Sequence, residues 1–324
     1  MKKGIKKTNQ KKPSEIQGSA SLEVSYNDIF DTLVEGYGKK DDKESKKKFT
    51  ELFSRLLAQT IARHKCAEEY NILFLFDNTT LIKSDSDRIY QAIYSLERNK
   101  KPLLLILLSR GGEPGSAYLI GKLCRESCNN KFAISVPRYA KSAATLLACA
   151  ADEIHMGSLS ELGPIDPQIN GMPALGLKSS IEHIADLVSK KPLSAEMFAK
   201  YLSYSIEPIQ IGYYERAAKS AEQYAEKLLK SHKQKAGFVP EEIAFKLVHE
   251  YKDHGFVIDK VEARNIFGEE VIKGNSPEYD LGNDIYFEFS RIEEIADFLG
   301  FNFYFIGSLK SEPQFTRKIR PRGK

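Results

Sequence analysis

Apolar and amphipathic segments alternate along the chain between residues 70 and 156. Continuous apolar runs are separated by segments in which apolar side chains recur every three or four positions, as in a helix packed on one face. The runs that predict strands are 72–76, 103–108, 131–136 and 153–156, and the segments that predict helices are 84–98, 116–128 and 142–151. Residues 103–108 are uniformly apolar, which is typical of a strand buried on both faces of a parallel sheet. The pattern therefore predicts an α/β fold with a mostly parallel core sheet.

Helical patterns flank this alternation on both sides. Before it, a long amphipathic helix is predicted from Asp42 to Tyr70, with an apolar stripe that either packs against the domain or meets a second subunit. That stripe consists of Phe49, Leu52, Phe53, Leu56, Leu57 and Ile61. After it, helices are predicted at 178–190, 194–204, 207–232, 240–251 and 259–267. The aromatic-rich segments 285–289, 291–299 and 301–306 predict a strand, a helix and a strand, which we expect to form a small extra sheet.

These patterns divide the chain into four parts. We expect residues 1–44 to be a disordered or extended basic arm and residues 45–268 to be the main domain with its helical extension. Residues 269–312 are expected to form a small α+β extension, and residues 313–324 a basic tail.

The charge is distributed unevenly between the tails and the rest of the chain. Residues 1–12 carry six lysines and no acidic residue, and residues 313–324 carry five basic residues and no acidic one. Removing these eleven charges from the net charge of +4 leaves about −7 for the other residues. Basic tails can bind nucleic acid, but solvated ends are the commoner case, so nucleic-acid binding is possible and not expected.

Several classes of protein are disfavoured by composition. The longest purely apolar run has six residues, which predicts no membrane span, and the basic N-terminal segment lacks the apolar core of a signal peptide. We therefore expect a cytoplasmic protein. The four cysteines form no Cys-x-x-Cys pair and predict buried free thiols, not a metal site or a disulfide framework. No metal or other cofactor is expected.

A pair of glycines and a later serine suggest acyl-transfer chemistry. Gly111 and Gly112 follow the strand 103–108 and precede a helix, where free backbone N–H groups can stabilise an oxyanion. Ser142 opens the next small-residue helix and could act as a nucleophile. From the residues alone, Ser142 could equally be a helix cap, and the glycines could be ordinary turn residues.

Four segments carry a resemblance to a known family. Arg110-Gly111-Gly112, 140–145, 151–154 and 162–168 resemble the Clp-fold serine peptidases. Among these, the serine dehydrogenase proteinase family, a relative of Clp protease and signal peptide peptidase A, is the most similar. The resemblance covers about residues 70–170 and extends more loosely to about 268. It implies a Clp/crotonase-like fold, a homo-oligomer and a peptide or protein substrate.

The resemblance also implies roles for individual residues. It places the nucleophile at Ser142, the oxyanion loop at Gly111 and Gly112, the base at His254 and the orienting carboxylate at Asp166. His254 lies in the loop 252–258, and Asp166 lies between two prolines in 162–168. Clp protease itself carries its histidine soon after the serine, and this chain has none at that place.

The base therefore stays open at this point. His155 ends a strand near Ser142 in sequence and is the local alternative to His254. A Ser–Lys dyad is a further alternative, with Lys141, Lys178 and Lys219 as candidate lysines.

Three functions compete at this stage. The first is an ATP-independent serine peptidase, since no Gly-x-x-x-x-Gly-Lys-Ser/Thr motif occurs in the chain. The second is a crotonase-like acyl-CoA enzyme, although that chemistry needs carboxylates where this chain has Ser142. The third is a non-catalytic scaffold that binds a partner or nucleic acid through its basic ends.

Overall fold

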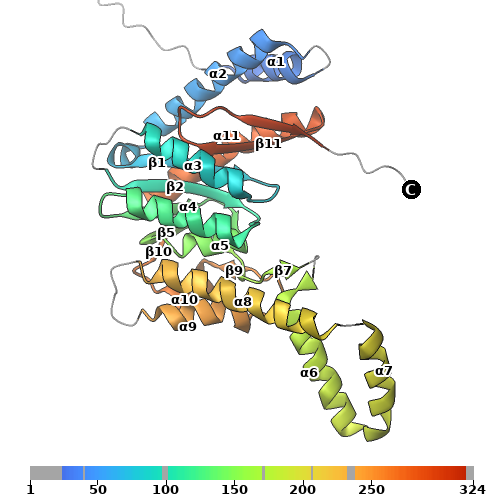
Figure 1. Ribbon diagram of the computed structural model, residues 1–324. Coiled ribbons are helices and arrows are strands. Elements are labelled where there is room, and N and C mark those ends of the chain that lie inside the picture. Colours follow the sequence, from blue (N-terminus) through green and yellow to red (C-terminus); the bar gives the residue numbers. More distant parts are fainter. Residues whose placement is uncertain are drawn as a thin grey trace, which may run out of the picture.

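A mostly parallel sheet forms the centre of the molecule (Figure 1). The computed structural model describes residues 24–38, 41–96, 101–169, 172–205, 207–231 and 238–318. Along the sheet the strands are β10 (Ile272–Gly274), β5 (Glu153–Met156), β3 (Phe132–Val136), β2 (Leu103–Ser109), β1 (Asn71–Asp77), β11 (Phe301–Gly307) and β12 (Gln314–Arg317). The strands from β10 to β1 are parallel to their neighbours. The predicted α/β class with a parallel core is confirmed.

Helices cover both faces of this sheet. Along β1, Leu73 and Leu75 face one layer while Phe74 and Phe76 face the other, because successive side chains in a strand point to opposite sides. The first layer contains α3 (Lys83–Ser95), α4 (Pro114–Ser127) and α5 (Ala143–Ala148), and the second contains α2 (Lys43–Ala62) and α11 (Pro277–Phe298). All seven residues of β2 are buried between the layers, as its uniformly apolar sequence predicts.

The apolar stripe of α2 packs inside the chain. Phe53 stacks on Phe289 of α11 and meets Phe305 of β11 edge-on, with ring centroids 5.9 and 4.9 Å away. The helix ends at Ala62, earlier than expected, and a short 3₁₀ helix at Lys65–Glu69 leads into β1. Part of the arm expected to be disordered or extended is a helix: α1 (Tyr26–Tyr37) packs against α2 with Ile29 and Leu33 fully buried.

The C-terminal segments differ from the prediction. Residues 285–289 lie inside α11 and not in a strand. Ser276 caps this helix and Pro277 opens it, and its buried positions Ile285, Phe289 and Ile292 recur at helical spacing despite their β-forming side chains. β11 does not form a separate sheet but pairs antiparallel with β1 in the central one. The division of the chain at residues 44, 268 and 312 stays a prediction.

The helical region that follows β5 in the sequence includes an arm that projects from the body. It comprises α6 (Ala174–Lys190), α7 (Ala195–Ser205), α8 (Pro208–Leu229), α9 (Pro240–Phe245) and α10 (Lys260–Phe267). The C-terminal half of α8 packs on α4 and α5 through its buried alanines, whereas α6 and α7 project away from the body (Figure 1). Within the described ranges, no helix is long and apolar enough to cross a membrane.

The cysteines are all free thiols, as expected. Cys124 and Cys149 are buried, whereas Cys66 and Cys128 are only partly buried. Burial raises the pKa of each of these thiols. In the part of the chain that the structure describes, no group of three or more His, Cys, Asp or Glu side chains is placed to hold a metal ion.

Candidate active site

Segments far apart in the sequence line one cavity at the carboxyl ends of β1 and β2. Its volume is about 580 Å³. The wall residues come from the loop after β1, the glycine loop after β2, the turn before α5, the loop before β7 (Gln168–Ile169) and the loop before β9 (Ile258–Asp259). They are Thr79, Thr80, Ile82, Arg110, Gly111, Gly112, Glu113, Pro114, Ser142, Ala143, Ile165, Pro167, Gln168 and His254. The cavity therefore contains Ser142, both predicted glycines and the predicted histidine.

Ser142 lies in a strained turn between β4 (Tyr139–Ala140) and α5. Its φ of +50° and ψ of −115° are rare for a residue with a side chain, and such backbone strain concentrates at functional sites. Its hydroxyl makes no capping hydrogen bond to α5, so it is not the ordinary helix cap that the residues alone allowed. The turn is braced from behind by Thr145, which donates to the Ala140 carbonyl at 2.7 Å and accepts from the Gly163 N–H at 3.1 Å.

Gly111 fits closely against the Ser142 turn. Its φ is +96°, and a Cβ atom at this position would lie 2.6 Å from the Lys141 carbonyl oxygen and 2.9 Å from the Ala143 nitrogen. Any side chain here would separate the glycine loop from the serine turn. Gly111 is therefore required by close approach, in addition to its positive φ.

Gly112 lies just as close to another backbone segment. A Cβ atom there would lie 2.3 Å from the Leu81 carbonyl oxygen, and Leu81 is held beside the loop by two backbone hydrogen bonds. The Leu81 N–H donates to the Gly111 carbonyl at 2.9 Å, and the Glu113 N–H donates to the Leu81 carbonyl at 2.8 Å. Neither of these two bonds uses the Gly112 N–H.

The backbone donors around Ser142 are not equivalent. The Gly111 N–H donates to the buried Ser109 hydroxyl at 3.1 Å. Across the described ranges, no hydrogen bond uses the N–H of Gly112 or that of Ala143. Ala143 follows Ser142 directly and lines the same cavity, but sequence reasoning did not identify it. Its N–H can be recognised as a possible donor only from the close contact between the serine turn and the glycine loop.

His254 and Asp166 lie next to each other, and His254 lines the same cavity as Ser142. The His254 Nδ1 atom is 3.6 Å from the Asp166 Oδ2 atom, which is within ion-pair distance but longer than a hydrogen bond. The Asp166 carboxylate is 10% exposed, and it accepts from the Gln168 side-chain amide at 3.2 Å. Burial raises the pKa of Asp166, and the nearby His254 offsets part of that rise. The Oδ1 atom of Asp166 and the Nδ1 atom of His254 have no hydrogen-bond partner.

Lys141 ties together the two loops that carry these side chains. Its ammonium donates to the carbonyl of Leu162, at 3.2 Å, and to that of Phe256, at 3.3 Å, and it forms an ion pair with Glu161. Leu162 precedes the Asp166 loop, and Phe256 follows His254 by two residues. The structure therefore gives Lys141 a bracing contact with both loops, which adjacency to Ser142 in the sequence did not suggest.

The other candidate bases lie elsewhere. His155 is buried in β5, where its Nδ1 atom is 2.7 Å from the Ser276 hydroxyl. His64 pairs with Asp284, and His249 pairs with Glu222. None of these histidines, nor His183, lines the Ser142 cavity. His232 lies outside the described residues.

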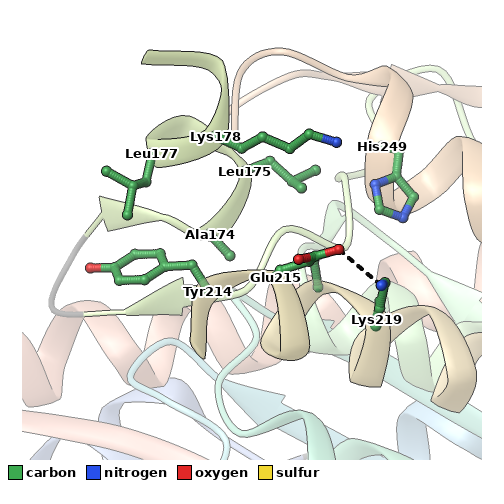
Figure 2. A pocket seen from close by; sticks show the side chains of 9 residues that line it. Ala174, Leu175, Leu177, Lys178, Tyr214, Glu215, Lys219 and His249 are labelled. Atoms are coloured by element: carbon green, nitrogen blue, oxygen red, sulfur yellow. Dashed lines mark ion pairs between the residues drawn. The ribbon is translucent and has the colours of Figure 1, made fainter. Parts of the chain in front are cut away.

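The two downstream lysines line a different cavity, at the root of the arm. Figure 2 shows Lys178 of α6 and Lys219 of α8 in the wall of this second cavity, together with His249. Lys219 forms an ion pair with Glu215 at 2.9 Å, and Lys178 forms one with Glu182 at 3.9 Å. Neither lysine lines the Ser142 cavity.

Comparison with known families bears on this geometry. Residues 73–200 match the model of the ClpP-like SDH-type serine proteinases. The resemblance of the chain to Clp-fold serine peptidases is thereby confirmed over this ClpP-like segment. The segment contains Gly111, Gly112, Ser142 and Asp166, whereas His254 lies beyond it.

Two curated relatives match part of the same chain. One is the uncharacterized protein MJ0137 of Methanocaldococcus jannaschii, 38% identical over 98 residues, which are 30% of this chain and 34% of that protein. The other is the uncharacterized protein MJ1495 of the same organism, 34% identical over 109 residues, which are 34% of this chain and 37% of that protein. The match thus spans about a third of the length of each relative.

Solved structures of lower similarity also match. Two mutants of the 1510-N membrane-bound stomatin-specific protease, one of them in complex with a substrate peptide, are each 14% identical to this chain. Their TM-scores are 0.40 and 0.39, with 69% and 78% of this chain and 84% and 91% of theirs covered. This likeness is too low to inform on the site described above.

Proposed function

We propose that this protein is a serine peptidase that cleaves peptide bonds through Ser142 without using ATP. The observation that carries the proposal is the strained Ser142 turn, which shares one cavity with two unpaired backbone N–H groups and with His254. The match of residues 73–200 to a serine proteinase family supports it. The segment contains the nucleophile candidate and both glycines.

In the proposed reaction, the Ser142 hydroxyl oxygen attacks the carbonyl carbon of the scissile peptide bond while His254 accepts its proton. The tetrahedral intermediate collapses when the carbon–nitrogen bond breaks, and His254 returns the proton to the leaving amine. Water then attacks the acyl ester, with His254 again accepting a proton, and this releases the second product and restores the Ser142 hydroxyl. Asp166 orients the His254 ring and stabilises its positive charge.

We assign the oxyanion site to the N–H groups of Gly112 and Ala143. Both are free of other partners in the described part of the chain, and both belong to residues of the cavity wall. Gly111 was expected to donate as well, but its N–H is engaged by Ser109. In this proposal Gly111 allows the glycine loop to lie against the Ser142 turn.

A Ser–Lys dyad has less support. The ammonium of Lys141 is held by two carbonyls and the Glu161 carboxylate. Lys178 and Lys219 line a different cavity. Among the described residues of the Ser142 cavity there is no lysine.

A fluorophosphonate probe tests the nucleophile directly. We expect the probe to label the full-length protein at Ser142, as mapped by mass spectrometry, and not to label Ser142→Ala. Ser180→Ala, which removes an exposed serine of α6, is the matched control and should label normally. Hydrolysis of a peptide mixture without nucleotide should also depend on Ser142. Labelling at another serine, or full hydrolysis by folded Ser142→Ala, would refute the proposal.

Other expectations from the sequence stay proposals. A homo-oligomer is consistent with the exposed apolar side chains on the projecting arm, such as Leu193, Met197 and Tyr204. Sedimentation analysis would test it, and a monomer at all concentrations would contradict it. The cytoplasmic location and the absence of nucleic-acid binding by the basic tails also stay predictions.

A further inference from the structure

Arg110 contributes a positive charge to the wall of the Ser142 cavity. It follows β2 directly and precedes the proposed oxyanion donor Gly112 by two residues. Of the described residues that line this cavity, Arg110 is the one arginine, and there is no lysine. An arginine is charged at every physiological pH. The wall of this cavity therefore carries a permanent positive charge, in the same loop as the proposed oxyanion donor Gly112.

A polar platform holds the Arg110 side chain in place. Its guanidinium lies over the ring of Tyr139, 5.9 Å from the ring centroid. The Tyr139 hydroxyl donates to the side-chain oxygen of Asn78, whose amide nitrogen in turn donates to the Glu293 carboxylate. Burial raises the pKa of Tyr139, and the nearby Arg110 charge offsets part of the rise. The hydrogen bond to Asn78 fixes the Tyr139 ring, and the ring in turn partly orders the Arg110 guanidinium before a ligand binds.

The Arg110 charge is not neutralised by an ion pair. Within the described ranges, no carboxylate lies within ion-pair distance of its guanidinium, and Arg110 takes part in no salt bridge. The carboxylate of Glu113, which lines the same cavity, accepts from the Ser116 hydroxyl at 2.9 Å. Glu293 is bonded to Asn78, and the Arg110 charge acts on it from beyond ion-pair distance, offsetting part of the rise that burial causes in the pKa of Glu293. The guanidinium thus retains donors that can face a ligand in the cavity.

We infer that Arg110 selects peptides that carry a carboxylate within about two residues of the scissile bond. The reach follows from chain geometry, since Arg110 is two residues from Gly112 and an extended chain spans about 3.3–3.6 Å per residue. Guanidinium groups bind carboxylates through paired hydrogen bonds of fixed geometry. The carboxylate can belong to an aspartate or glutamate side chain or to a free C-terminus. This inference rests on the proposed function, because it names the substrate class of the same cavity.

The expected selectivity is modest because Arg110 is exposed. Ion pairs at exposed sites are screened by water, so a preference of about fivefold for an acidic peptide over its neutral counterpart is expected. The chain outside its two tails carries a net negative charge, which disfavours acidic peptides at long range. A preference for them would therefore have to arise from a local contact.

Equilibrium binding measures this contact without requiring turnover. The full-length Ser142→Ala protein is titrated with fluorescent, neutral, C-terminally amidated octapeptides in which one position at a time is glutamate or glutamine. A second arm compares the free C-terminal acid with the amide of the neutral peptide. We expect glutamate, or the free acid, to bind about fivefold more tightly at one or two adjacent positions, and which arm responds identifies the source of the carboxylate.

Variants of Arg110 give the decisive comparison. In the Ser142→Ala background, Arg110→Gln should abolish the preference and Arg110→Glu should turn it toward lysine-containing peptides. Arg317→Gln is the matched control, since Arg317 is also exposed and lies over an aromatic ring, that of Phe301, at 5.6 Å, outside this cavity. It should leave the preference unchanged. Equal thermal unfolding of all variants would show that they fold.

The outcomes separate this inference from the proposed function. A preference that persists in Arg110→Gln, no preference in any peptide pair, or no peptide binding at all would overturn the role of Arg110. If the serine-containing protein hydrolyses peptides with no acidic preference, the peptidase proposal stands and the role of Arg110 fails. If Arg110-dependent binding occurs but the probe labels no serine, the binding role stands and the peptidase proposal fails.

Discussion

At the scale of single residues, the base is the assignment most in need of a test. His254 is separated from Ser142 by more than a hundred residues, yet both line one cavity, and Asp166 is 3.6 Å from the His254 ring. His155, the alternative near Ser142 in the sequence, is buried in β5 with Ser276. The proximity of Asp166 makes His254 the better candidate for the base, and a kinetic comparison of variants tests this assignment.

His254→Ala should reduce kcat/KM by a factor on the order of 10⁴ or more, about as severely as Ser142→Ala, because members of a catalytic triad act as a unit. His183→Ala, which removes an exposed histidine from α6, should have no effect. Peptide hydrolysis by the purified, folded variants is the measurement. Near-normal turnover in His254→Ala would instead indicate a lysine base, and activity would then rise into the alkaline range.

Asp166→Asn should lower the activity without lowering the thermal stability at pH 7. Burial raises the pKa of the Asp166 carboxyl, so the folded state binds its proton more tightly than the unfolded state does. The charged carboxylate therefore destabilises the fold above this titration range, and the destabilisation disappears as the pH falls through it. At pH 7 Asp166→Asn should unfold at a temperature equal to or higher than the wild type, with the difference shrinking in acid.

Its activity should fall at the same time, by roughly a hundredfold or more, because the orienting charge is lost. Thermal unfolding between pH 4 and pH 8 and hydrolysis at pH 7 test both parts. A variant that is less stable than the wild type at pH 7, with the gap closing in acid, would show that the carboxylate stabilises the fold.

At the scale of elements, the glycine loop is positioned by close backbone contact between Gly112 and Leu81. Gly112→Ala places a Cβ atom 2.3 Å from the Leu81 carbonyl oxygen, so the glycine loop must shift away from Leu81. We expect loss of probe labelling at Ser142 and a lower melting temperature.

Gly115→Ala is the matched control, because a Cβ atom at Gly115 meets no atom within 4 Å. It lies three residues further along, in the first turn of α4. It should label and melt like the wild type. If Gly112→Ala behaved in the same way, the close approach to Leu81 would not be required for the site.

The loops that carry Asp166 and His254 are braced by Lys141. Lys141→Met keeps the length of the side chain but removes the donors to Leu162 and Phe256. We expect kcat to fall about ten- to a hundredfold through misplacement of His254. Backbone hydrogen exchange in residues 252–257 should become faster, which a group acting directly as the base would not require.

Lys178→Met serves as the control for that change, since Lys178 lies in the second cavity of Figure 2. It should leave both kcat and the exchange rates unchanged. Slow exchange at 252–257 in a Lys141→Met protein with low activity would argue that Lys141 acts on the reaction itself.

At the scale of the whole molecule, an aromatic cluster joins the N-terminal helices to the C-terminal strands. Phe53 of α2 packs on Phe289 of α11 and Phe305 of β11, and all three side chains are fully or almost fully buried. Phe53→Ala should lower the free energy of unfolding by about 3–5 kcal/mol, because it opens a cavity in this cluster. Chemical denaturation measures the loss.

Phe298→Ala removes the same side chain from the exposed end of α11, where Phe298 is 83% exposed. Its unfolding free energy should stay within about 0.5 kcal/mol of the wild type. A small effect of Phe53→Ala would mean that the N-terminal helices contribute little to the stability of the sheet.

The sequence by itself determined the local structure of most of the chain. Strand and helix periodicities are properties of neighbouring residues, so the pattern predicted β1, β2, β3 and β5 and the helices between them. The Gly-Gly pair and Ser142 were identifiable for the same reason, since each motif is a short stretch of sequence. The segment 285–289 was mistaken for a strand because its aromatic residues favour strands, whereas their helical spacing prevails in α11.

Only the tertiary structure decided which distant segments meet. β11 pairs with β1 across more than two hundred residues because its apolar side chains complete the aromatic cluster on α2 and α11. A different pairing, of β6 (Glu161–Leu162) with β9, brings together the loops that carry Asp166 and His254. Tertiary contacts also place the Ala143 N–H beside the glycine loop and engage Lys141 with two loop carbonyls. The periodicity of a segment shows which of its faces is buried, but it does not show which other segment covers that face. The contacts around Ser142 join segments that are distant in the sequence, and so they could be recognised only in the folded structure.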